Sequence, residues 1–138
     1  MRYLGLDIGD SWIGVALSDP LGKLASPLTI IRRQDEQVDL EAIVGIISQH
    51  GVNLVIVGLP RSMDGSLGMQ AEKVEAFTRQ LRCKTKVPVE FRDERLTTVS
   101  AKRLMRESSN KKTKKKTRDD AVAAALILQG FLDEDDSC

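Results

Sequence analysis

The sequence predicts an α/β protein built on a mixed five-stranded sheet with helices on its faces. Three strand-like segments near the start of the 138-residue chain are separated only by turns, which is typical of an antiparallel meander. After them, helical and strand-like segments alternate, which is typical of parallel strands joined by helices. The length suits a single domain over residues 1–138, in which residues 133–138 are expected to form a flexible tail.

The first predicted strand, residues 3–8, ends in an acid. Leu4, Leu6 and Ile8 are every second residue, and Asp7 lies between the last two. A turn at residues 9–11 leads to a second strand, and strands over residues 12–18 and about 23–31 complete the meander. A carboxylate at the end of a core strand is costly unless a cation meets it. Asp7 is therefore a candidate metal ligand, with a cap of the following turn as the alternative.

The middle of the chain alternates between helix and strand. The spacing of Leu40, Ile43, Val44 and Ile47 predicts one buried face of a helix over residues 37–50, which Gly51 ends. The helix C-terminus explains His50, the only histidine. The continuous apolar run at residues 54–57 predicts a strand buried on both faces, near the centre of the sheet.

The second half should add three helices and one strand. A helix is predicted from residue 66 or 67 to 82, and a strand over residues 87–92, with Pro88 at its start or on an edge. A helix over about 98–107 and a mobile loop over 108–117 follow. The last helix should begin at Thr117 or Arg118 and end near Leu132, with an alanine-rich buried interior.

Charge and cysteine content exclude several classes of protein. Residues 102–118 hold nine basic residues and one acid, although the net charge of the whole chain is only +1, which indicates a polyanionic partner. Two cysteines, Cys83 and Cys138, form neither a disulfide framework nor a CxxC site, so we expect a cytoplasmic protein. No secretory leader and no apolar run of about 18 residues is present, so no membrane association is expected.

Carboxylates end or begin several core elements. Asp7 ends the first strand, Asp93 and Glu94 follow the fifth, and Asp119 and Asp120 open the last helix. Three carboxylates at one edge of a sheet would repel each other unless a divalent metal bound them, and oxygen ligands suit Mg²⁺ or Mn²⁺. Strand parity does not choose between the adjacent acids of the fifth strand. A solvated strand end and an acidic helix N-terminus are the alternatives.

Five motifs occur in order across nearly the whole chain: Asp7-x-Gly9-x-x-x-x-Gly14-Val15-Ala16, Val57-Gly58-Leu59-Pro60, Met63-Asp64-Gly65, Asp93-Glu94-Arg95-Leu96-Thr97-Thr98 and Asp120-x-x-Ala123-Ala124-x-x-Ile127-Leu128-Gln129. In this order and at this length, the set resembles the YqgF/RuvX family of Holliday junction resolvases, also described as pre-16S ribosomal RNA nucleases. Ser62 stands where that family usually has asparagine, and we expect Asp64 to be a turn residue.

The resemblance implies a ribonuclease-H-like fold and a metal-dependent endonuclease. The acids that bind one or two Mg²⁺ or Mn²⁺ ions would be Asp7, Glu94 and Asp120, with Asp119 as a substitute for the last, and Arg95 would meet phosphate. Substrates would be structured RNA, above all the 5′ end of pre-16S ribosomal RNA within precursor particles, or branched DNA. The protein would be a monomer or a homodimer. Symmetric junction cutting would need the homodimer, because it takes two copies.

A lysine-rich stretch directly precedes Asp120 and would hold the nucleic-acid backbone. It comprises Lys111, Lys112, Lys114, Lys115, Lys116 and Arg118. Phosphate contacts of this kind provide affinity without sequence recognition. Because most of the few aromatic residues resemble core residues, a base-stacking, single-strand platform is not expected. Two alternatives remain: a non-catalytic nucleic-acid- or ribosome-binding factor on a nuclease-like fold, and one lobe of an actin-like ATPase, which opens with a similar Asp-x-Gly hairpin.

Overall fold

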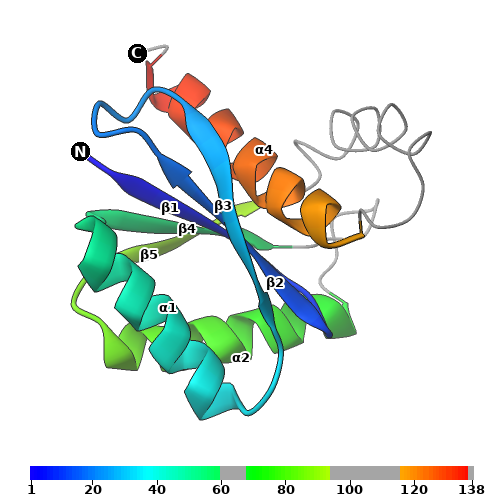
Figure 1. Ribbon diagram of the computed structural model, residues 1–138. Helices are drawn as coiled ribbons and strands as arrows, with labels where there is room; N and C mark the ends of the chain where they lie inside the picture. Colours follow the sequence, from blue (N-terminus) through cyan, green and yellow to red (C-terminus); the bar gives the residue numbers. More distant parts are fainter. Residues whose placement is uncertain (60–67, 94–115, 137–138) are drawn as a thin grey trace.

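The computed structural model describes residues 1–59, 68–93 and 116–136. A five-stranded sheet forms the middle layer, with α1 and α2 on one face and α4 on the other (Figure 1). The elements are β1 (Tyr3–Ile8), β2 (Trp12–Ser18), β3 (Ala25–Arg32), α1 (Glu36–His50), β4 (Leu54–Leu59), α2 (Met69–Lys84), β5 (Val89–Asp93) and α4 (Lys116–Asp136).

The sheet has the order β3-β2-β1-β4-β5, which confirms the predicted mixed sheet. β1, β2 and β3 form the antiparallel meander, and β4 and β5 add to β1 as parallel strands. The carboxyl ends of β1, β4 and β5 therefore meet at one edge of the sheet. β5 is an edge strand, and Pro88 directly precedes it, as predicted.

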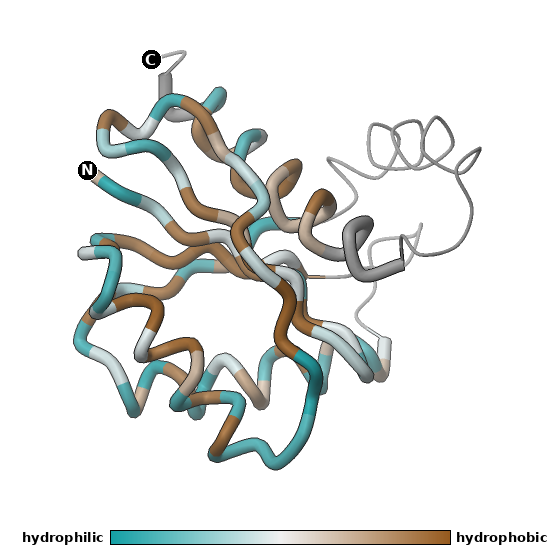
Figure 2. The backbone as a smooth tube through the Cα atoms, in the orientation of Figure 1, coloured by the Kyte–Doolittle hydropathy of each residue, from teal (hydrophilic) through white to brown (hydrophobic). Residues whose placement is uncertain are grey.

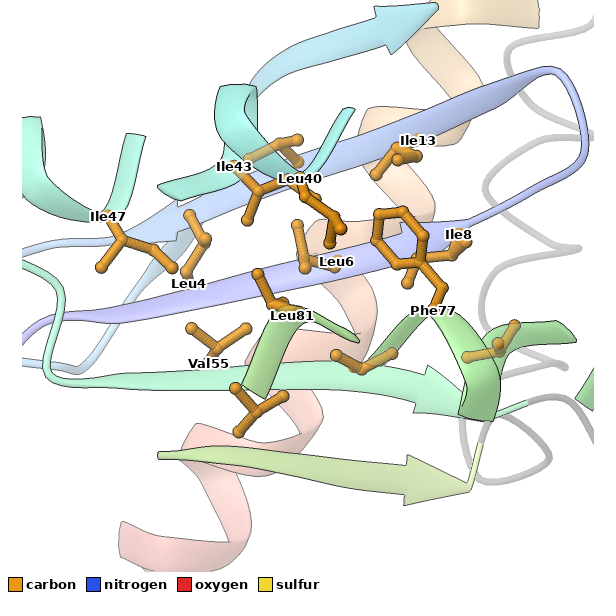
Figure 3. Packing of buried hydrophobic residues seen from close by; sticks show 14 of the residues in the cluster. Leu4, Leu6, Ile8, Ile13, Leu40, Ile43, Ile47, Val55, Phe77 and Leu81 are labelled. Carbon is orange, nitrogen blue, oxygen red and sulfur yellow. The ribbon is translucent and has the colours of Figure 1, made fainter. Parts of the chain in front are cut away.

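Two apolar cores lie on the two faces of the sheet. Leu4, Leu6 and Ile8 of β1 point toward α1 and α2, where they pack with residues such as Leu40 and Phe77 (Figure 3). On the other face, the buried side of α4 packs against a smaller set that includes Tyr3, Ala16 and Ile56. In β4, Val55 and Val57 face the first core and Ile56 the second, so this strand is buried on both faces as predicted.

Hydropathy follows the layers of the fold. Figure 2 shows hydrophobic residues along the central strands and hydrophilic residues in the connection that follows β3. α1 ends where predicted, because Gly51 adopts a left-handed conformation with φ of 62°. In the turn between β2 and β3, backbone N–H groups of Leu24 and Lys23 donate to the Asp19 carboxylate and lower its pKa.

Several boundaries differ from the predicted ones. β4 extends to Leu59, β5 starts and ends later than predicted, and α2 ends at Lys84. The predicted α2 start at residue 66 or 67 and the predicted helix over 98–107 lie outside the described residues. These shifts are small because the apolar spacing, which sets the element type, is local, whereas the ends depend on neighbouring segments.

α4 is longer than predicted at both ends. It begins at Lys116, just before the predicted start at Thr117 or Arg118. It continues to Asp136, so residues 133–136 are helical and not the predicted flexible tail. Arg92 of β5 explains the extension, because its Nη1 lies 2.7 Å from Glu134 Oε1, and this hydrogen bond lowers the pKa of Glu134.

Glycine at position 5 allows α4 to lie directly on β1. A Cβ atom added there would lie 2.8 Å from Leu128 Cβ and 2.9 Å from the Ala124 carbonyl oxygen. Real Cβ atoms do not make such short contacts, so any larger residue would force the helix away from the strand. Within the described part of the chain, no helix has the length and apolar character that a membrane span requires.

Gly5→Ala should therefore lower the free energy of unfolding, by about 1–3 kcal/mol as for other overpacked cores. Gly45→Ala is the matched control, since a Cβ at this position in α1 would meet nothing within 4 Å and alanine favours a helix by up to about 1 kcal/mol. Urea unfolding of the two variants measures the difference. Equal stabilities would contradict the close contact between α4 and β1.

Candidate active site

Asp7 lies near the carboxyl end of β1, on the face that α4 covers. Side chains alternate along a strand, and Leu4, Leu6 and Ile8 point toward α1 and α2. Tyr3 packs with α4, and Gly5 contacts it, so Asp7 belongs to the α4 face. Its position is partly exposed. The carboxylate is thus held by a rigid central strand, at the edge where three parallel strands end.

Glycines flank Asp7 on both neighbouring strands. Asp7 is paired with Gly14 of β2, which has no side chain. On the other side, the pairing of Leu6 with Val57 brings Asp7 level with Gly58, the next residue of β4. Two neighbouring positions on the same face therefore lack side chains.

The direction of α4 brings its N-terminal end to the same edge. Its C-terminal half lies near the start of β3, because the Gln129 side chain accepts a hydrogen bond from Ala25 N (2.8 Å) and donates one to the Lys23 carbonyl (2.9 Å). Its middle crosses β1 at Gly5, below Ala124. The helix backbone at Asp120, one turn before Ala124, therefore lies toward the Asp7 end of β1.

The last two residues of β5, Arg92 and Asp93, belong to opposite faces of the sheet. Arg92 points to the α4 face, where it pairs with Glu134 and lies against Gly130. Val89 and Phe91 pack in the core beneath α1 and α2, and by the same alternation Asp93 belongs to that face. Asp93 and Asp7 are therefore on opposite faces of the sheet.

Most of the other predicted site residues cannot be placed. Glu94, Arg95 and residues 111–115 lie outside the described residues, and Lys116, Arg118, Asp119 and Asp120 are described only as helix backbone. Among the side chains that the structure describes, no three of the metal-binding types gather into one site. The described geometry thus brings Asp7 and the first turns of α4 together.

The turn after Asp7 is held in place by Arg33, a residue that the sequence analysis missed. The Arg33 side chain donates to the Gly9 carbonyl (2.7 Å), and its backbone N–H donates to the Ser11 carbonyl (2.8 Å). Its Nε also pairs at 2.9 Å with Asp39, whose side chain is 1% exposed. The guanidinium stacks over Phe77 at 5.0 Å, so the β1–β2 turn is linked to both α1 and α2.

One signal for this interaction was present in the sequence. Asp39 directly precedes Leu40 and lies four residues before Ile43, so the helical period places a charged residue on the buried face of α1. A buried carboxylate needs a cationic or hydrogen-bonding partner. The sequence gives no indication that the partner is Arg33, because that depends on how β3 leads into α1.

A pocket of about 280 Å³ opens beneath the same turn, on the face of α1 and α2. Acidic and basic side chains both line it, and Lys73 Nζ lies 3.5 Å from Asp10 Oδ1 at its rim. The pocket and Asp7 are on opposite faces of the sheet, so we do not assign it to the candidate active site. Its lining residues are Ile8, Gly9, Asp10, Arg33, Glu36, Gln70, Lys73, Ala76 and Phe77.

Comparison with known proteins gives matches over almost the whole chain. The family model described as "RuvX: Holliday junction resolvase" matches residues 1–134. The "Putative pre-16S rRNA nuclease" of Moorella thermoacetica is 51% identical over 133 residues, which are 96% of this chain and 95% of the relative. The protein of that name from Dehalococcoides mccartyi is 51% identical over 128 residues, 92% of this chain and 94% of the relative.

Solved structures show the same architecture at low sequence identity. RuvC from T. thermophilus in complex with a Holliday junction substrate has a TM-score of 0.62 and 14% identity, over 100% of this chain and 98% of RuvC. The Fowlpox virus resolvase with its junction DNA has a TM-score of 0.58 and 12% identity, over 97% and 98%. The fold is therefore ribonuclease-H-like, as the resemblance in sequence implies.

Replacing Arg33 by methionine should destabilise the protein by about 3 kcal/mol, because the buried Asp39 carboxylate would lose its cation. The double variant Arg33→Met/Asp39→Leu should recover much of this loss, since it removes both charges together. Urea unfolding of the two variants and the wild type measures both effects. A single variant that is no less stable than the double would show that the pair does not hold the turn.

Proposed function

Because this chain belongs to the RuvX family, we propose that it is an endonuclease that hydrolyses nucleic-acid phosphodiester bonds. Its biological role would be maturation of the 5′ end of pre-16S ribosomal RNA, with resolution of branched DNA junctions as the alternative. The observation that carries the proposal is the convergence of Asp7 and the N-terminal end of α4 at one edge and one face of the sheet.

The proposed ligand set fits a divalent cation by its chemistry. Asp7, Glu94 and Asp120 would hold one or two Mg²⁺ or Mn²⁺ ions, because hard divalent cations prefer carboxylate oxygens. Such a cation, when bound, would lower the pKa of water and neutralise charge on the phosphate. The two residues beside Asp7 in the sheet, Gly14 and Gly58, are compatible with this assignment, since neither adds a side chain next to the carboxylate.

The structure also bears on the choice between neighbouring acids. Asp93 belongs to the face of α1 and α2, opposite to that of Asp7, so the described part of β5 does not favour Asp93 as the acid that joins Asp7. In α4, Asp120 begins the row of positions that continues through Ala124 and Leu128, the two residues against Gly5. Asp119 does not belong to that row, which favours Asp120.

Each of these groups has a stated task. Asp7, Glu94 and Asp120 would provide carboxylate oxygens as metal ligands, and in this way they would orient the scissile phosphate and the attacking water. Arg95 and the basic residues Lys111, Lys112, Lys114, Lys115, Lys116 and Arg118 hold neighbouring phosphates of the backbone. Since the lysine-rich stretch directly precedes Asp120 in the chain, the substrate would be bound beside the carboxylates.

Asp7→Asn should lower cleavage by at least about 100-fold, because even residues that only support metal ligands account for 10–100-fold. Asp10→Asn is the matched control: it removes a carboxylate three residues away on the same turn, with a side chain that is 68% exposed. Cleavage of a 5′-extended 16S precursor RNA and of a four-way DNA junction is measured with Mg²⁺ and with Mn²⁺.

The two substrates separate the two proposed roles. Binding of the same two nucleic acids, measured at several salt concentrations, separates binding from catalysis. A folded Asp7→Asn variant that cleaves like the wild type would overturn the assignment of Asp7. Wild-type protein that binds both nucleic acids in a salt-dependent way, but cleaves neither with either metal, would instead establish the non-catalytic binding factor.

A further inference from the structure

Trp12 is the only tryptophan of the chain, and it is not a core residue. The sequence predicts that most of its aromatic residues belong to the core, and this is correct for Tyr3 and Phe77, which are 9% and 2% exposed. Trp12, the first residue of β2, is partly exposed. A large aromatic ring at the end of a hairpin strand, open to solvent, is available for contact with another molecule.

A guanidinium lies over this ring. Trp12 is paired with Arg32 across the β2–β3 ladder, and the Arg32 Cζ atom lies 5.8 Å from the centroid of the indole. Arg32 is the last residue of β3 and is exposed. Paired residues of neighbouring strands share a face, so the ring and the guanidinium form one surface element.

This pair lies beside Asp7 on the same face of the sheet. Asp7 is paired with Gly14, and Trp12 is two residues further along β2, so alternation gives all three the same face. Asp7 and Trp12 are therefore diagonal neighbours, for which the Cα atoms are typically about 7–8 Å apart, within reach of an aromatic side chain. Gly14, directly opposite Asp7, has no side chain to separate them.

An aromatic ring with a guanidinium over one face fits one nucleotide, whose base would stack on the other face of the ring. Bases stack on aromatic rings with about 1–3 kcal/mol per base, and arginine binds the adjoining phosphate. The base must be unpaired, because bases within a duplex are stacked on each other. The nearest acidic side chain of the turn, Asp10, is paired with Lys73 at 3.5 Å, which reduces its repulsion of phosphate.

We propose that Trp12 and Arg32 bind an unpaired nucleotide next to the scissile phosphate, so that the enzyme selects nucleic acid with unpaired bases at the cleavage point. This proposal rests on the proposed function only for the position of the scissile phosphate at Asp7. Single-stranded ends, bulges and branch points of nucleic acid offer such bases, whereas a continuous duplex does not. If the pair served only to stabilise the hairpin, it would contribute about 0.2–1 kcal/mol to folding and nothing to binding.

Because Trp12 is the only tryptophan, its fluorescence reports on this contact in the unmodified protein. The full chain is titrated, in EDTA so that no cleavage occurs, with a single-stranded RNA of about 12 nucleotides, within the range of known single-strand sites. A blunt duplex of the same sequence is titrated in parallel. Stacking predicts saturable quenching by the single strand and much weaker quenching by the duplex.

Substitutions then measure the contribution of each group. Trp12→Leu should weaken binding of the labelled single strand by about 5- to 150-fold, whereas Trp12→Phe should retain most of the affinity. Arg32→Gln should weaken binding and lower the salt slope by about 1. Arg79→Gln is the matched control, because this exposed arginine lies on α2, which covers the opposite face of the sheet, and its loss should leave binding unchanged.

Three results would overturn the proposal: no quenching at saturating single strand, equal quenching by single strand and duplex, or equal losses from Arg32→Gln and Arg79→Gln. None of these depends on cleavage, so the proposal and the proposed function fail separately. Loss of cleavage in Asp7→Asn without quenching of Trp12 would retain the nuclease and reject the nucleotide contact. Quenching with unchanged cleavage in Asp7→Asn would retain the nucleotide contact and reject the assignment of Asp7 to the active site.

Discussion

The contact between α4 and β1 at Gly5 determines where the other parts of the candidate site lie. A helix packed on a strand through bulky side chains would be held further away, but here Leu128 and the Ala124 carbonyl meet a position without a Cβ atom. The buried face of α4 is accordingly rich in alanine, including Ala121, Ala124 and Ala125. Small residues at the crossing thus set the distance between the helix and the strand that carries Asp7.

Contacts at the other end of α4 fix its direction. Gln129 binds the backbone at the start of β3, and Glu134 pairs with Arg92 of β5. The C-terminal half of α4 is therefore attached to both edge strands of the sheet. With one crossing point and these two attachments, the N-terminal end of the helix is directed to the carboxyl ends of the parallel strands. The interactions that position the candidate site are therefore largely remote from it.

The two faces of the sheet have different tasks. The face of α1 and α2 contains the larger apolar core (Figure 3). On that face Arg33, which pairs with Asp39, holds the β1–β2 turn. The face of α4 carries Asp7 and the Trp12–Arg32 pair at its open edge. A rigid turn between them keeps the carboxylate and the aromatic ring in a fixed relation, which nucleotide binding beside a scissile phosphate requires.

Local sequence patterns were sufficient for the strand order of the meander, the buried β4, and the candidacy of Asp7. They were insufficient where partners are distant in sequence: the Arg92–Glu134 pair that extends α4, and the Arg33–Asp39 pair beneath the turn. The sequence also left open whether Trp12 belongs to the core, for a related reason. An aromatic residue at the first position of a strand fits either a core or a rim, and only the neighbouring Arg32 and the end of the hairpin distinguish them.

The central claim is that β1 and the start of α4 form one metal-binding site at this edge of the sheet. A crystal structure of the protein with Mn²⁺, located by its anomalous scattering, tests this most directly. The account predicts an ion bound jointly by the carboxylates of Asp7 and Asp120, at coordination distances close to the roughly 2.1 Å typical of Mg²⁺. An ion bound without either residue, or Asp7 and Asp120 too far apart to share one, would contradict it.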